Sequence, residues 1–254
     1  MFSALSLPAL ETYQWAWLLA SAFLIGMAKA GVKGLGMFVV PAMAAAFGGK
    51  VSVGLVLPLL SMADVFAVSY YNRDAEWKYI WRLLPTAAIG VLIGIWVGNE
   101  VADAAFTDMI AVIIIGSLVL LVLQQNTRFS DLMARYWWVG AIFGAVGGFT
   151  TMIGNAAGPV MAVYLLATRI PKNSFIGTTA WFFLIINLFK IPFHIWVWET
   201  INLQSFLLDL CGLPAIALGI FVGIRVVRLI PEQAFRYFVI GMTFLISLRL
   251  LLGA

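Results

Sequence analysis

Lys29, Lys33, Asp64 and Lys190 are ionisable residues that we place within the long apolar stretches of this 254-residue chain, away from its loops. Each charge placed at the centre of a bilayer costs about 2.5–3.5 kcal/mol on insertion scales, so each needs a partner or a watered cavity. Three positive charges and one negative charge leave the interior positive. We therefore expect an anionic substrate whose charge is compensated when the site fills.

Asn187 precedes Lys190 by three residues, so both side chains share one helix face. Asn187 also follows Asp64 by 123 positions, which is an offset at which the two halves of the chain match. We interpret the carboxylate and the amide as parts of one central site, divided between charge and hydrogen bonding. Two alternatives stay open: Lys190 pairs with Asp64 for structure alone, or Asp64 carries protons.

Two apolar stretches contain clusters of residues that break helices. In a membrane, broken backbone flanked by apolar half-helices is typical of a transporter binding site. Half-helices are expected to begin near Leu35 and near Ala157, and their N–H groups would attract an anion. Asn155 and Thr178 would add neutral donors, with Thr150, Thr151 and Thr179. The break residues are Gly31, Gly34, Gly36, Gly154, Gly158 and Pro159.

Lys29 and Lys33 flank the first break, and they either serve the site or snorkel to water at a shallow tip. The single histidine, His194, is interpreted as interfacial. One histidine and one cysteine exclude a multi-histidine metal site, a cysteine-built metal site and an intrachain disulfide. There is no phosphate loop, HExxH or nucleophile elbow, so we expect neither a cofactor nor enzyme activity.

Composition sets the class of protein. The chain is 63% hydrophobic and only 10% charged, and its mean hydropathy is +1.04, whereas a soluble domain is roughly half apolar and a quarter charged. We predict an all-α polytopic membrane protein. Its basic residues lie mostly in short loops, which indicates membrane orientation rather than nucleic-acid binding.

The broken stretches cover about 13–48 and 137–168, and intact spans are predicted at 51–71, 80–99, 107–125, 174–198, 204–226 and 234–252. About 20 residues suffice to cross a hydrocarbon core of roughly 30 Å. A continuous helix of about 35 residues would be roughly 50 Å long, which is too long for one comfortable crossing. Each broken stretch is therefore either a steeply tilted helix or a hairpin of two short helices.

The distribution of charge favours hairpins. Single crossings would place six basic loop residues on each side, which carries no orientation signal. With hairpins, ten basic residues fall on one side and only Lys50 and Arg249 on the other, as the positive-inside rule requires. Both termini would then lie outside the cell. The ten are Arg73, Lys78, Arg82, Arg128, Arg135, Arg169, Lys172, Arg225, Arg228 and Arg236.

The two halves, residues 1–126 and 127–254, resemble each other. Leu84-Pro85, Gly90 and Gly94 match Leu213-Pro214, Gly219 and Gly223, all 129 positions later. Each half reads as a broken hairpin followed by three spans, and five crossings per half make the second copy enter from the opposite side. We predict two inverted-topology repeats within one membrane domain. The glycines four residues apart are interpreted as helix-packing positions.

The blocks GMAKAGVKGLG, NAAGP, GTTAW and NLFKIPF resemble the TauE/SafE family of sulfite and organosulfonate exporters, which includes 4-toluene sulfonate uptake permeases. The resemblance covers nearly the whole chain. It implies an inner-membrane permease that moves sulfite, sulfoacetate or a similar sulfonate outward. Lys33 replaces a glycine of the general family pattern, in the segment GVKGLG.

Together these observations predict a transporter that works by alternating access between two repeats. Lys29 and Lys190 would neutralise the anion, Asn155 and Asn187 would orient it, and Asp64 would balance charge or couple protons. The alternative is a membrane subunit without flux that binds an enzyme of sulfur metabolism, although short loops leave it little surface. The oligomeric state stays open, with a homodimer among the alternatives.

Overall fold

The apolar stretches of the chain fold into helices, and the computed structural model describes residues 10–32, 34–123, 137–226 and 232–252. Within these ranges the chain is helical and contains no strand, as predicted. The first half comprises α1 (Thr12–Lys29), α2 (Leu35–Phe47), α3 (Gly49–Tyr71), a 3-10 turn (Asn72–Asp74), α4 (Trp77–Glu100) and α5 (Asp103–Leu123). The second comprises α7 (Trp137–Gly154), α8 (Gly158–Ala167), α9 (Lys172–Trp196), α10 (Leu203–Cys211), α11 (Leu213–Val226) and α12 (Glu232–Leu251).

Five helical segments in the described part of the chain are long and apolar enough to cross a membrane. They correspond to α3, α4, α5, α9 and the combined α10 and α11. Shorter apolar helices include α2, α7 and α8. The prediction of a multi-pass membrane protein is therefore confirmed.

Both broken stretches form hairpins rather than tilted single helices. Gly31 and Gly34 have φ angles of 110° and 94° in the turn between α1 and α2. This left-handed region is open to glycine because glycine has no Cβ. The second turn joins α7 to α8, and Pro159 lies in the first turn of α8. There its missing N–H costs no helical hydrogen bond.

The predicted span 204–226 differs from expectation because it divides at Gly212 into α10 and α11. Pro214 is the second residue of α11, so the carbonyl of Leu210 has no N–H to accept from one turn later. Pro85, its counterpart 129 positions earlier, lies inside α4 without ending that helix. The two halves are thus similar in order but not in every element.

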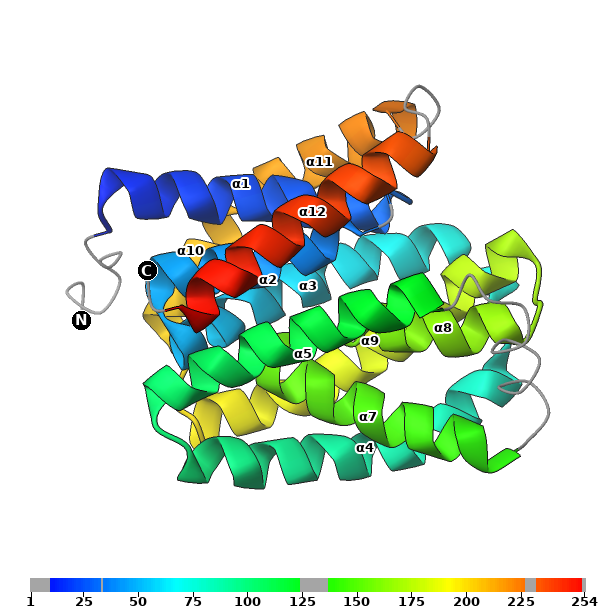
Figure 1. Ribbon diagram of the computed structural model, residues 1–254. Helices are drawn as coiled ribbons and strands as arrows, with labels where there is room; N and C mark the ends of the chain where they lie inside the picture. Colours follow the sequence, from blue (N-terminus) through cyan, green and yellow to red (C-terminus); the bar gives the residue numbers. More distant parts are fainter. Residues whose placement is uncertain (1–9, 33, 124–136, 227–231, 253–254) are drawn as a thin grey trace.

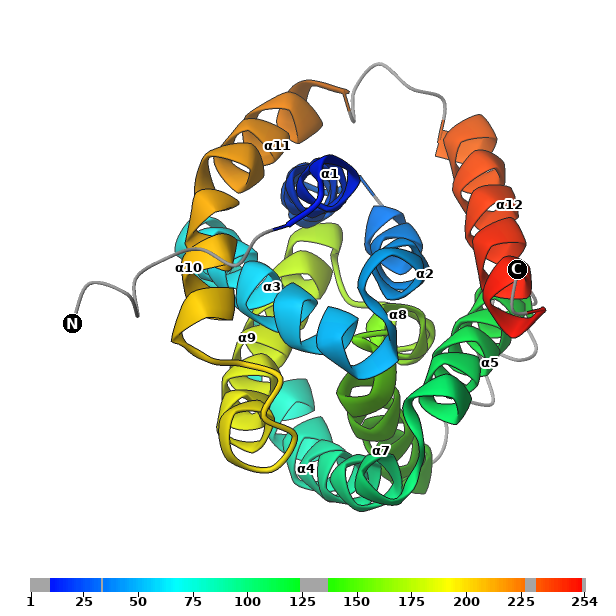
Figure 2. The same ribbon diagram turned by 90° about the vertical axis from the view of Figure 1, so that its left-hand side faces the viewer.

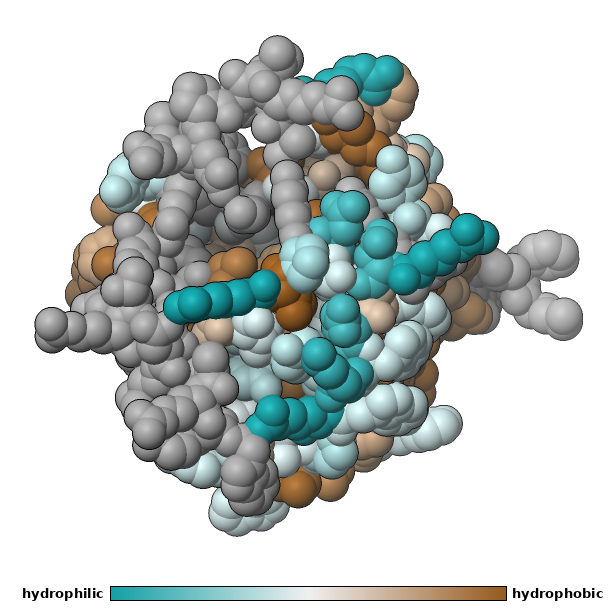
Figure 3. All heavy atoms as spheres, turned by 90° about the vertical axis from the view of Figure 1, so that its right-hand side faces the viewer, coloured by the Kyte–Doolittle hydropathy of each residue, from teal (hydrophilic) through white to brown (hydrophobic). Residues whose placement is uncertain are grey.

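The helices lie roughly along one long axis, with α1 beginning and α12 ending at the same end of the molecule (Figure 1). Viewed along that axis, α2 and α8 lie inside a ring that includes α4, α5, α11 and α12 (Figure 2). Hydrophilic residues gather on the opposite end face (Figure 3). That end includes the turn between α3 and α4, in agreement with the expected grouping of loops.

The two halves are packed into each other, because the hairpin of each half contacts helices of the other half. Helix α1 packs against α11, and α7 packs against α4. A Cβ built on Gly219 would lie 2.1 Å from the carbonyl oxygen of Phe23, and one on Gly90 would lie 2.0 Å from that of Ala145. Side chains larger than hydrogen do not fit at these crossings, so these glycines are helix-packing positions.

The packing partners of the remaining helices also correspond between the two halves. The third helix of each half, α3 and α9, pack against each other. Helix α2 packs against α12, and α8 packs against α5. Equivalent helices of the two halves thus have equivalent partners, and the inverted relation between the halves stays a prediction.

Candidate functional site

A line of buried polar side chains runs between α3 and α9. Asp64 of α3 and Lys190 of α9 are both 0% exposed, and Asn187 is 1% exposed. The Nδ2 of Asn187 donates a hydrogen bond of 2.9 Å to the Oδ2 of Asp64. The structure thus brings the carboxylate and the amide together, as the offset of 123 residues suggested.

Lys29, the last residue of α1, forms an ion pair with Asp64. Its ammonium also lies over the ring of Phe183, 5.0 Å from the centroid. The Lys29 side chain keeps 18% of its surface exposed, whereas that of Asp64 keeps none. The ion pair removes the need for this lysine to snorkel to bulk water, because its charge has a partner inside the protein.

Lys190 binds the tip of the second hairpin. Its Nζ donates to the carbonyl oxygen of Thr151 at 2.8 Å, to the Oγ1 of Thr151 at 3.0 Å and to the Oδ1 of Asn155 at 2.6 Å. An ammonium has three N–H donors, so all of them are used. Lys190 therefore does not pair with Asp64 in this structure, which is one alternative that the sequence left open.

Asn155 occupies the break between α7 and α8. Its φ angle of 50° lies in the left-handed region, where asparagine is tolerated better than most side chains. This turn aims its side chain so that Oδ1 accepts from Lys190 while Nδ2 donates to the carbonyl of Val53 at 3.1 Å. One amide thus connects the hairpin to both α9 and α3.

The two hairpin tips contact α3 at different depths rather than at a single point. Along α3, the first tip contacts Asp64 and the second contacts Val53. These positions are 64 − 53 = 11 residues apart, or about 16 Å along a helix axis. The tips pass each other because α1 and α7 enter from opposite ends (Figure 1), and the polar line joins them.

Thr178 lies elsewhere. It precedes Lys190 by 190 − 178 = 12 residues on the continuous helix α9, which is about 18 Å along the axis. There its Oγ1 accepts a hydrogen bond of 2.9 Å from the backbone N–H of Glu76. The structure does not bring Thr178 together with the polar line, and Lys33 falls outside the described residues.

The predicted break residues form the turns or the first turns after them. Gly31 and Gly34 lie between α1 and α2, and Gly36 is the second residue of α2. Gly154 ends α7, while Gly158 and Pro159 begin α8. Thr150 and Thr179 donate to carbonyl oxygens of their own helices, those of Gly147 and Phe175. These two hydroxyls are therefore engaged locally.

Two polar residues are buried although sequence reasoning did not anticipate it. His194, interpreted as interfacial, is 0% exposed, and its Nδ1 lies 2.8 Å from the Oγ1 of Thr200. Asp209 is also 0% exposed, and neither of its carboxylate oxygens has a hydrogen-bond partner. Its position inside the predicted span 204–226 was the signal that could have identified it.

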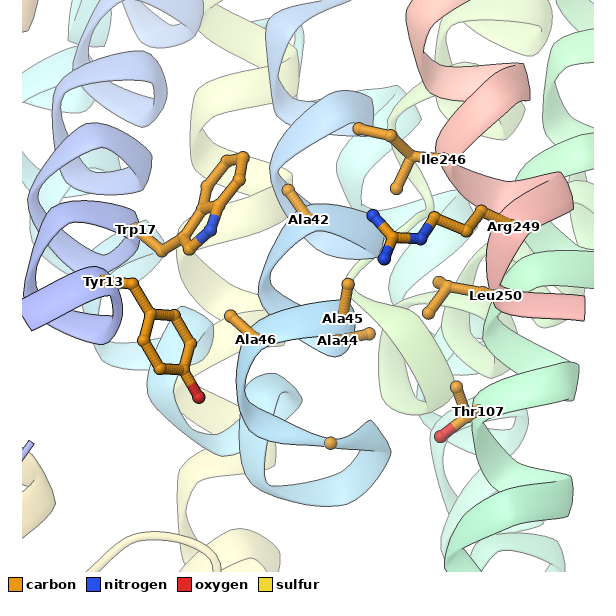
Figure 4. Close-up of a pocket in the computed structure, with 11 residues that line it drawn as sticks. Tyr13, Trp17, Ala42, Ala44, Ala45, Ala46, Thr107, Ile246, Arg249 and Leu250 are labelled. Carbon is orange, nitrogen blue, oxygen red and sulfur yellow. The ribbon is translucent and has the colours of Figure 1, made fainter. Parts of the chain in front are cut away.

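A pocket of about 530 Å³ lies apart from the polar line, between α1, α2, α5 and α12 (Figure 4). The guanidinium of Arg249 points toward the alanines of α2, and Tyr13 and Trp17 lie on the opposite side. None of the pocket's lining residues belongs to the polar line. Among the described residues, no group of three or more His, Cys, Asp or Glu side chains could hold a metal ion.

The arrangement suits recognition of an anion. The described part of the polar line carries two lysines and one aspartate, hence one net positive charge. The backbone N–H groups at the start of α8 lie next to Asn155 in the chain and add positive potential there. The site thus offers charge, N–H donors and an amide in one buried region.

Comparison with known proteins places the chain in a family. The family model described as "Sulfite exporter TauE/SafE" matches residues 18–250, which is most of the chain. A search of curated proteins found no match, and a search of solved structures found none either. The chain therefore belongs to the TauE/SafE family, a family of membrane transporters for sulfite and related anions.

Proposed function

We propose that this protein is a secondary transporter that exports small sulfur-containing anions, such as sulfite, sulfoacetate or related organosulfonates, across the bacterial inner membrane. The family assignment supports the class of substrate. The single observation that carries the mechanism is the set of three bonds from the buried Lys190 to Thr151 and Asn155 at the hairpin tip.

A bound oxyanion would compete with Asn155 for the Nζ of Lys190. Sulfite and sulfonate oxygens are hydrogen-bond acceptors with negative charge, and charge-assisted hydrogen bonds are roughly twice as strong as neutral ones. The Oδ1 of Asn155 is a neutral acceptor that holds one N–H of Lys190. A bound anion would replace it and leave the amide of Asn155 to donate to the anion instead.

This exchange connects substrate binding to motion of the hairpin. While Lys190 holds Thr151 and Asn155, it fastens the α7–α8 tip to α9. When the anion takes the N–H that Asn155 held, the fastening is reduced to the two bonds with Thr151. A ligand shifts a conformational equilibrium only by its differential affinity for the two states. Lys190 supplies such a difference, and the halves would then rock against each other around the polar line.

The test is sulfite flux into proteoliposomes containing the purified protein. We expect flux with the wild type and its loss in Lys190→Gln, which keeps a hydrogen-bonding side chain but removes the charge. Lys78→Gln is the matched control, because the Lys78 side chain is 68% exposed and does not belong to the polar line. Folding of both variants is checked by gel filtration and thermal unfolding.

Normal flux in a folded Lys190→Gln variant would remove Lys190 from the site. Sulfoacetate and other sulfonates are assayed in parallel, because loss of one anion with retention of another identifies the substrate. A well-folded wild type that moves none of these anions would contradict the proposed function.

A further inference from the structure

The molecule contains a second buried carboxylate that the proposed anion site does not use. Asp209 lies in α10, its side chain is 0% exposed, and both of its oxygens lack a hydrogen-bond partner. Asp64, by contrast, is ion-paired with Lys29 and accepts from Asn187. The two carboxylates therefore have opposite surroundings, one compensated and one bare.

The neighbourhood of Asp209 is apolar. Its neighbour Leu208 belongs to a buried cluster with Leu18 and Ala22 of α1 and Leu55 and Leu59 of α3. A bare carboxylate in such surroundings is very costly, so the group takes up a proton and becomes neutral. A neutral carboxylic acid without a partner costs much less than an unpaired charge.

The position of Asp209 in its helix also favours the protonated form. It lies in the last turn of α10, which ends at Cys211. The carbonyl groups at a helix C-terminus carry partial negative charge, which disfavours an anion there. Burial and the helix dipole therefore both favour the neutral acid.

Charged groups on the neighbouring helices do not offset this preference of Asp209 for its neutral form. Helix α10 packs against α3 and α11, and a Cβ built on Gly212, just after α10, would lie 3.2 Å from Ala22 of α1. No side chain of these helices forms a hydrogen bond with Asp209. Their described titratable groups are Tyr13 and Lys29 of α1, Lys50, Asp64 and Tyr70 of α3, and Arg225 of α11.

We propose that Asp209 is the proton-carrying site of the transporter, and that Asp64 is a permanent counter-charge. Asp209 lies where the two halves of the chain meet, because α10 of the second half packs against α3 of the first. Rocking of one half against the other would open the α10–α3 contact and admit water to Asp209.

The chemical step is a simple ionisation. With water present, the carboxyl O–H bond breaks, its electron pair stays on the oxygen, and the proton passes to water. The carboxylate stays in contact with water until rocking exposes it to the opposite side of the membrane, where it takes up a proton from water before the α10–α3 contact closes. One proton is thus carried per cycle. The coupling role rests on the proposed transport function, whereas the protonation of Asp209 does not.

The first experiment is infrared spectroscopy of the purified protein in liposomes at neutral pH. We expect a C=O band from a protonated carboxylic acid that is absent in Asp209→Asn. Asp108→Asn is the matched control and retains the band, because Asp108 of α5 is exposed. Persistence of the full band in Asp209→Asn, or its absence in the wild type, would overturn the protonated state.

The second experiment measures sulfite flux with and without a proton gradient. The wild type is expected to respond to the gradient, whereas Asp209→Asn keeps flux down the anion gradient and loses the proton response. Asp209→Leu, which replaces the acid by an apolar side chain of similar volume, serves if the asparagine variant fails to fold. A full proton response in either variant would overturn the coupling role.

These readouts separate the two proposals. If no anion moves in the wild type, the transport function fails, and the infrared band still decides whether Asp209 carries a proton. If flux is normal and the band is insensitive to Asp209, the transport function stands and the proton site is wrong.

Discussion

The Nδ2 of Asn187 donates a hydrogen bond of 2.9 Å to the Oδ2 of Asp64, and this bond joins the two halves of the chain at the crossing of α3 and α9. The carboxylate receives Lys29 on its other oxygen. A single buried aspartate thus accepts a cation from its own half and an amide from the other. The carboxylate of Asp64 is thus a point of contact between the two halves.

Lys29→Met should destabilise the protein by about 3 kcal/mol, the low end of the range for broken buried ion pairs, since Lys29 is 18% exposed. The loss arises because Asp64 stays buried without its counter-charge. The midpoint of thermal unfolding in detergent measures it. Adding Asp64→Leu to Lys29→Met should recover most of the loss, because no charge then remains unpaired.

Lys78→Met serves as the control for Lys29→Met, because Lys78 is 68% exposed. An exposed ion pair contributes at most about 1 kcal/mol, so this variant should unfold near the wild-type temperature. Equal unfolding temperatures for Lys29→Met and the wild type would show that the ion pair is dispensable.

Replacement of Asn155 separates its side chain from its backbone. Asn155→Gly keeps the left-handed turn, whose φ angle is 50°, and removes only the bonds to Lys190 and Val53. Asn155→Ala also strains the backbone, by roughly 1–2 kcal/mol. We expect both variants to lose anion flux, and only alanine to add that extra loss of stability in thermal unfolding.

Sulfite transport by Asn155→Gly at the wild-type rate would show that the amide of Asn155 does not contact the anion. Equal unfolding temperatures of the glycine and alanine variants would instead contradict the account of the turn.

Gly90→Ala should cost about 1–3 kcal/mol, typical of overpacking. The new Cβ would lie 2.0 Å from the carbonyl oxygen of Ala145, so α4 and α7 must separate. Gly116→Ala is the matched change on α5, where a Cβ meets nothing within 4 Å. Helix propensity then favours alanine, by up to about 1 kcal/mol. Thermal unfolding of the pair in one detergent measures the difference.

The helix arrangement predicts that both termini face the same side of the membrane, outside the cell. Helix α1 begins and α12 ends at one end (Figure 1). In the sequence, the opposite side carries ten of the twelve basic loop residues, and the positive-inside rule assigns it to the cytoplasm. Reporter tags fused to each terminus test this orientation. Cytoplasmic readings from both tags would invert it.

Much of the fold could be predicted because a membrane imposes strong constraints on sequence. Hydropathy located the helices, and the charge distribution between loops favoured hairpins over single crossings. Leu35, expected near the start of a half-helix, is the first residue of α2. The division at Gly212 was missed because both segments are apolar, so hydropathy does not register the break.

The candidate site was less predictable, because depth in the membrane depends on how far each hairpin reaches. Asp64, Asn187 and Lys190 could be grouped by offset and helix face. Thr178 lies on the same helix as Lys190 but at another depth, which helix periodicity does not reveal. The bonds from Lys190 to Thr151 and Asn155 depend on the crossing of the hairpin tips, which is a property of the packed molecule alone.

The exchange of hairpins between the halves has a consequence for biosynthesis. Gly26 of α1 packs against the backbone of Ile216, which the ribosome adds only when most of the chain is already in the membrane. Helix α1 must therefore wait in lipid, or against an insertion factor, until α11 arrives. The amino-terminal half made alone lacks the surface on which its first hairpin rests, and should be captured by membrane quality-control proteases rather than accumulate.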